Sequence, residues 1–118
     1  MSSNVPFDRR TLIDNLGGDL ELYGEIARIF LDHYPLELDN LQHALTAGDA
    51  GKMHRIAHSL KGAISNFSAP RATAAARNLE MSLKDGMCEQ AAALVEETLI
   101  AVRELGDAMR ADLSGLKV

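Results

Sequence analysis

The residues of this chain best suited to chemistry lie close together, at His58, Lys61 and Gly62. A helix advances by about 100° per residue, so Lys61 and Gly62 fall on the same helical face as His58, one turn further along. The apolar residues of this segment fall on the opposite face: Met53, Ile56, Ala57, Leu60, Ala63, Ile64 and Phe67. His58 is therefore predicted to be exposed, beside a cation and a residue without a side chain.

These residue types suit phosphoryl transfer. A neutral imidazole can attack phosphorus and leave again, so a histidine can carry a phosphoryl group covalently. The transfer needs accurate positioning and a cation against the equatorial oxygens, and Lys61 lies within reach of such oxygens. Gly62 costs about 1 kcal/mol relative to alanine in a helix interior. That cost is explained if a partner protein must approach His58 closely.

The charge of the chain is unevenly distributed. The net charge is -5, yet residues 51–84 hold six basic residues against the single acid Glu80, and the remainder holds six basic and 16 acidic residues. The overall acidity argues against nucleic-acid binding. The basic excess around His58 favours an acidic or phosphorylated partner, although scattered solvated Lys and Arg would give the same count.

The elements that position these residues are predicted to be helical. The 118 residues correspond to one domain, rich in alanine and leucine and without strand alternation. Residues 1–6 are expected to be a loose terminus. Helices are expected over about 7–16, from the Asp19 cap to Gly48, over 50–66, from Pro70 to Asp85-Gly86, and over 89–113. Short loops between amphipathic helices imply an all-α fold. We expect an antiparallel four-helix bundle over about residues 19–113, with a short additional N-terminal helix covering one end.

Pro35 lies inside the longest of these segments. A proline in a helix interior costs roughly 3 kcal/mol through a lost hydrogen bond and a ring clash. The apolar spacing of three and four nevertheless continues on both sides of it, at Tyr23, Ala27, Phe30, Tyr34, Leu38, Leu41 and Leu45. We therefore expect one long helix kinked near Pro35, with two abutting helices as the alternative.

The segment around His58 resembles the histidine phosphotransfer (HPt) domain family. The resemblance covers about residues 16–113 and rests on Ala57-His58-Ser59-Leu60-Lys61-Gly62-Ala63, on Ala47-Gly48-Asp49 before it, and on Ala69 and Leu79-Glu80 after it. It implies a four-helix bundle in a two-component phosphorelay, with receiver domains of response regulators or of a hybrid sensor kinase as partners.

The resemblance also implies roles for individual residues. His58 would accept a phosphoryl group from the aspartate of one receiver domain and pass it to another. Lys61 would stabilise the phosphoryl charge, and Gly62 would leave room for the receiver. Glu80 occupies the position of a polar residue that orients the histidine. The chain departs from the family at Ser68, where glycine is usual as a left-handed helix end; serine can instead cap the following helix.

Other functions fit parts of the sequence. His54 and His58, four residues apart, could ligate a metal ion, with Glu80 as the only nearby third ligand, but no Glu-x-x-His pattern of a di-metal bundle occurs. The basic face could also belong to a non-catalytic helical interaction module. His33 and His43 have no cation or glycine beside them and are interpreted as structural or solvated.

An ATP-dependent enzyme is not favoured, because the sequence has no phosphate-cradling glycine-rich loop. We therefore expect a phosphocarrier without an ATP site, metal or cofactor of its own, whose receiver partner is Mg-dependent. The chain has no apolar run long enough to span a membrane, no signal-peptide pattern and a single cysteine, Cys88, so we expect a cytoplasmic protein. We also expect a monomer, and the initial Met1 favours a free-standing carrier over a piece of a larger sensor protein.

Overall fold

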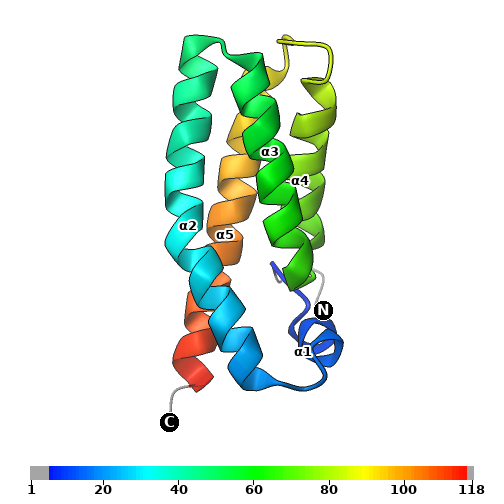
Figure 1. Cartoon of the computed structure of the whole chain (residues 1–118), viewed down its shortest axis with the longest axis vertical. Helices are drawn as coiled ribbons and strands as arrows, with labels where there is room; N and C mark the ends of the chain where they lie inside the picture. Colours follow the sequence, from blue (N-terminus) through cyan, green and yellow to red (C-terminus); the bar gives the residue numbers. More distant parts are fainter. Residues whose placement is uncertain (1–5, 117–118) are drawn as a thin grey trace.

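The computed structural model describes residues 6–116, which form five α-helices and one short 3₁₀ turn and contain no strand. The elements are α1 (Arg9–Asn15), α2 (Leu20–Ala47), α3 (Ala50–Ile64), the 3₁₀ turn η2 (Ser65–Phe67), α4 (Pro70–Ser82) and α5 (Ala91–Leu116). Helices α2 to α5 run up and down side by side, and α1 lies at one end (Figure 1). The predicted all-α bundle with a short N-terminal helix is confirmed, while the loose terminus falls almost wholly outside the described residues.

Aspartate caps set the starts of the two helices that lead to the site. Asp19 accepts a hydrogen bond from the Leu22 backbone N–H at 3.0 Å, and Asp49 accepts one from the Lys52 backbone N–H at 3.0 Å. Each bond satisfies a backbone donor that a helix start leaves without an internal partner. Between the two helices Gly48 adopts the left-handed conformation, with φ of 68°. These local signals fix where α3 begins and therefore where His58 falls along it.

Pro35 lies inside the single continuous helix α2. The axis of α2 changes direction partway along the helix (Figure 1). The expectation of one long, kinked helix is confirmed, and the alternative of two abutting helices is wrong. The preceding residue, Tyr34, packs its ring directly over Gly106 of α5, where an added Cβ would collide with the ring.

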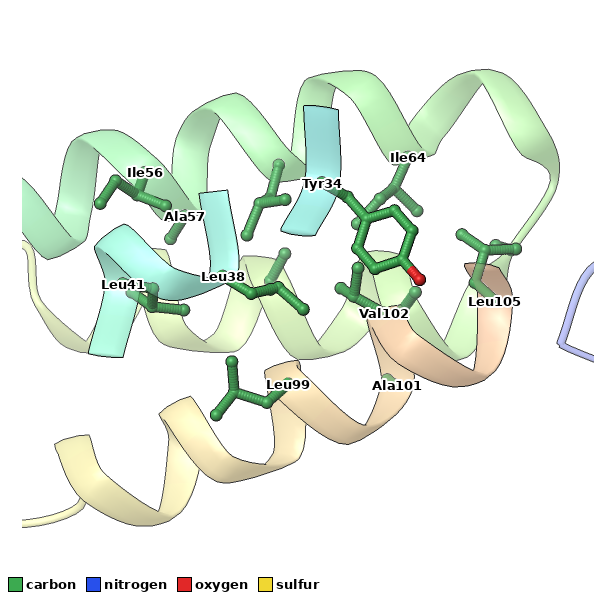
Figure 2. Close-up of a cluster of buried hydrophobic side chains, with 14 of the residues drawn as sticks. Tyr34, Leu38, Leu41, Ile56, Ala57, Ile64, Leu99, Ala101, Val102 and Leu105 are labelled. Atoms are coloured by element: carbon green, nitrogen blue, oxygen red, sulfur yellow. The ribbon is translucent and has the colours of Figure 1, made fainter. Parts of the chain in front are cut away.

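The core lies along the axis of the bundle. Figure 2 shows residues of α2, α3 and α5 that meet there: Tyr34, Leu38, Leu41, Ile56, Ala57, Ile64, Leu99, Val102 and Leu105. One sequence-based expectation is wrong, because Ala63 is exposed rather than part of the core face. Ala63 stands at the edge where α3 meets α2, and its small side chain leaves a groove there.

Helix α1 closes the end of the bundle below η2. Leu12 of α1 is fully buried, and the Asp8 backbone N–H donates to the Ser68 carbonyl oxygen at 2.8 Å. Ser68 adopts the left-handed conformation, with φ of 51° and ψ of 51°. The expected capping role of Ser68 is wrong, since Ala69 is the residue before α4 and no side chain caps that helix. Ser68 instead takes the backbone conformation for which glycine is usual, because the chain must reverse between η2 and Pro70.

Within residues 6–116, the helices lack the combination of length and apolar character that crossing a membrane would require.

Candidate functional site

His58 lies on the outer face of α3, with 67% of its side chain exposed. Its Nδ1 is 2.7 Å from Oε2 of Glu80 on the neighbouring helix α4. An ionised carboxylate can only accept hydrogen bonds, so the contact places the proton on Nδ1. The other ring nitrogen, Nε2, then carries the free lone pair, and it makes no hydrogen bond to the described residues.

Glu80 binds two functional groups of α3 at once. Its Oε1 accepts from the Lys61 ammonium, with Nζ at 2.7 Å, while Oε2 accepts from His58. The Lys61 hydrogen bond, followed by the His58 hydrogen bond, lowers the pKa of Glu80 below its ordinary value of 4.5. Glu80 therefore remains ionised at neutral pH. Because only 14% of its side chain is exposed, it forms the floor of the site beneath the imidazole and the ammonium.

Gly62 leaves open space beside His58. A Cβ added at this position would meet no described atom within 4 Å, and the residue is exposed. The neighbouring hydroxyl of Ser65 donates to the Gly62 carbonyl oxygen at 2.8 Å, so it serves the backbone at the end of α3. No described residue within 6–116 would clash with a larger side chain at position 62. Glycine nevertheless occupies this position, although it weakens the helix relative to alanine.

The remaining histidines do not join this site. His54 is half-buried one turn before His58, yet residues 6–116 contain no group of three or more His, Cys, Asp or Glu side chains arranged to hold a metal ion. His33 is exposed on α2, and its Nδ1–H donates to the Ile29 carbonyl oxygen at 2.8 Å. His43 is exposed on the same helix.

An apolar groove of about 260 Å³ between α2 and α3 adjoins the site. Ile29 of α2, which is 60% exposed, lines it together with Ser59 and Ala63 of α3. This groove was not predicted from the sequence. The sequence did contain a sign of exposed apolar surface on α2, because Leu22, Ile29 and Leu36 recur every seven residues outside the buried face of this helix. All three side chains are exposed.

An exposed histidine on a helical bundle, with one ring nitrogen held by a carboxylate of the next helix, is suited to carrying a phosphoryl group. The family model described as Hpt domain matches residues 25–115. The chain belongs to the Hpt domain family.

Two solved structures resemble the whole chain. The crystal structure of histidine-containing phosphotransfer protein B (HptB) from Pseudomonas aeruginosa PAO1 is 27% identical, with a TM-score of 0.82 over 93% of this chain and 96% of that one. The HPT domain from the Hpt sensor hybrid histidine kinase from Shewanella has a TM-score of 0.86 and 22% identity, over 96% of this chain and 97% of that one, and shows the shared fold. A comparison with curated protein sequences gave no significant match.

The family and the site agree on the kind of activity. The chain is a histidine phosphotransfer domain of a phosphorelay, and it is a carrier rather than a classical enzyme. Domains of this family interact with receiver domains.

Proposed function

We propose that His58 is the phosphoryl-accepting residue, taking the group from the aspartate of one receiver domain and passing it to another. The observation that carries this proposal is the 2.7 Å contact between His58 Nδ1 and Glu80 Oε2, made by an imidazole that is 67% exposed. The contact holds the ring proton on the inner nitrogen. It leaves the nucleophilic nitrogen free on an accessible side chain.

The transfer step follows from this arrangement. The lone pair of His58 Nε2 attacks the phosphorus of the aspartyl phosphate, so that an N–P bond forms. The bond between phosphorus and the carboxyl oxygen breaks, and its electron pair stays on the aspartate as a carboxylate. The ring becomes cationic because Nδ1 keeps its proton, and the negative charge of Glu80 stabilises that cation. Onward transfer reverses these changes against a second aspartate.

Lys61 and Gly62 assist the approach of the receiver. The Lys61 ammonium stands one turn from His58, bound to Glu80 Oε1 at 2.7 Å, and a flexible four-carbon stem lets it turn toward incoming phosphoryl oxygens. The open space above Gly62 admits the rim of the receiver's active site. The groove beside Ser59 and Ala63 offers the same partner an apolar contact.

The domain would work as a cytoplasmic monomer that binds no nucleic acid and has no ATP site or cofactor of its own. The support is the sequence, which has an acidic net charge of -5 and no phosphate-cradling glycine-rich loop. The phosphoryl group and the Mg²⁺ that assists its transfer would both arrive with the receiver domain. Receivers of response regulators and of hybrid sensor kinases are the proposed partners, the latter because one similar structure is described as the HPT domain of a hybrid histidine kinase.

The experiment that tests this proposal uses a receiver domain that has been phosphorylated with labelled acetyl phosphate and desalted. We expect an acid-labile, alkali-stable label on the unmodified chain and none on the His58→Gln variant. His43→Gln, which removes another exposed histidine of the same bundle, is the matched control and should be labelled normally. Labelling of His58→Gln by the same donor would refute the assignment, and binding without any label would favour a pure interaction module.

A further inference from the structure

The charges of the bundle separate by helix. Helix α3 carries three basic residues and no acid, and α4 with the turn after it carries three basic residues and two acids, Glu80 and Asp85. Helix α2 carries five acids against one arginine, and α5 carries five acids against two arginines. The site histidine therefore lies on one of two basic helices in a molecule whose other two bundle helices are acidic.

The packing of the helices turns this separation into two opposite faces. Helix α3 packs against α2 and α4, and α5 also packs against α2 and α4, so the four helices form a closed ring (Figure 1). In this ring the α3–α4 pair stands opposite the α2–α5 pair. The molecule therefore has a basic face, formed by α3 and α4, and an acidic face, formed by α2 and α5.

Two cations of the basic face are already engaged within the chain. Lys61 is bound by Glu80, and Arg71 is 2.9 Å from Glu104 of α5. Arg77 and Lys84 are exposed and form no ion pair with the described residues. These two cations therefore have their charge available to a partner.

Arg77 and Lys84 also stand in the right places to meet a partner bound at His58. They lie about one helical turn before and after Glu80, the residue that contacts His58, along α4 and its closing turn. An open groove of about 580 Å³ is lined by Arg77 of α4 together with Ser65 at the end of α3. Arg77 therefore borders the groove at the end of α3 where Ser65 lies.

We propose that Arg77 and Lys84 are recognition residues, which hold the acidic rim of a receiver domain against the α4 side of His58. This inference rests on the proposed function, because it takes the partner to be the receiver that delivers or accepts the phosphoryl group. The partner's chemistry follows from its task, since an aspartyl phosphate and the carboxylates that hold its Mg²⁺ are anionic. A basic face beside the nucleophile and an acidic face behind it orient such a partner before contact.

The expected effect is on association rather than on the chemical step. Charges arranged in this way raise association rates by roughly 10- to 1000-fold, and salt screens them over about 10 Å at 0.1 M ionic strength. Reversing two of the cations should therefore slow transfer from the receiver at low salt, and the difference should shrink as salt is added.

The test compares the double variant Arg77→Glu, Lys84→Glu with a control that carries the same type of change on the acidic face, Arg103→Glu. Arg103 is exposed on α5 and lines a groove with Pro35 of α2. The second-order rate of transfer from the phosphorylated receiver that labels the unmodified chain is measured at low and high salt. Each rate is divided by the rate at which phosphoramidate, a small phosphoryl donor, labels the same variant, so that changes in the reactivity of His58 cancel.

We expect the normalised rate of the double variant to fall roughly 10-fold or more at low salt, and that of Arg103→Glu to change less than twofold. A normalised rate for the double variant that equals the wild-type rate, or that matches the Arg103→Glu rate, would overturn the recognition role. Failure of the proposed function is seen separately, as labelling by the receiver that persists in His58→Gln.

Discussion

Two helical glycines of this domain, Gly62 and Gly106, serve different purposes. Gly106 of α5 is buried beneath the Tyr34 ring, where an added Cβ would collide with that ring. Gly62 of α3 is exposed, and an added Cβ would meet no described atom within 4 Å. Both glycines weaken their helices by about 1 kcal/mol relative to alanine. The interior of the fold explains the first, whereas the proposed close approach of a receiver domain would explain the second.

This difference fits the proposal that the outer face of α3 receives a partner protein. A residue that costs stability without improving internal packing stands beside an exposed imidazole and beside a carboxylate that binds both this imidazole and the Lys61 ammonium. Functional sites commonly break local rules of helix stability in this way. Two substitutions test whether the two glycines differ as described, and a third tests the carboxylate beneath His58.

The largest effect is expected for Gly62→Ala on transfer. The added methyl group should raise the free energy of unfolding by about 1 kcal/mol, yet slow transfer from a receiver roughly 100-fold, because it holds the reacting atoms apart. Stopped-flow transfer assays and urea unfolding measure the two quantities on the same protein. A variant that is more stable and transfers normally would show that clearance at this position is not needed.

The opposite pattern is expected for Gly106→Ala. Overpacking against Tyr34 should lower the free energy of unfolding by about 1–3 kcal/mol, while transfer from the receiver stays near the wild-type rate at temperatures where the variant is folded. Urea unfolding monitored by circular dichroism gives the stability, and the same transfer assay gives the rate. Equal or greater stability of this variant would remove the distinction between the two glycines.

The smallest effect is expected for the stability of Glu80→Gln, and it should depend on pH. Because the hydrogen bonds of Lys61 and His58 lower the pKa of Glu80 below 4.5, its ionised form stabilises the fold at pH values above 4.5. This contribution is lost as the pH falls through the lowered pKa, so the stability difference between wild type and variant should shrink there. The difference should be at most about 1 kcal/mol, as for other solvent-accessible ion pairs. Urea unfolding from pH 3 to pH 7 measures it, and a difference that grows on acidification would contradict the assignment.

Much of the fold followed from local sequence signals. Asp19, Gly48 and Asp49 marked helix boundaries because capping and left-handed helix ends involve only near neighbours along the chain. The register through Pro35 was readable because the apolar spacing continued on both sides of it. The role of Ser68 was predicted wrongly because this residue takes part in a contact between distant parts of the chain. Its carbonyl oxygen accepts a hydrogen bond from the backbone N–H of Asp8, 60 residues earlier.

The site was predictable in part for the same reason. Little more than one helical turn of α3 separates His58 from Gly62, and Lys61 lies between them. Helical geometry alone therefore places the three residues on one face. The groove beside Ala63 was not predicted, because exposure at the edge of a helix depends on how closely the next helix packs. The groove also depends on Ile29, which lines it from a different helix, α2.

The order of residues along the chain was enough to predict which residues share each helical face, where the helices begin, and which histidine lies beside a cation and a glycine. These properties depend on contacts within a few residues, which chain order fixes. The packing of the helices was needed to show that Glu80 binds both His58 and Lys61 and that the Tyr34 ring requires glycine at position 106. It also placed the basic helices opposite the acidic ones. These relations join different helices, and their distances exist only after the bundle has packed.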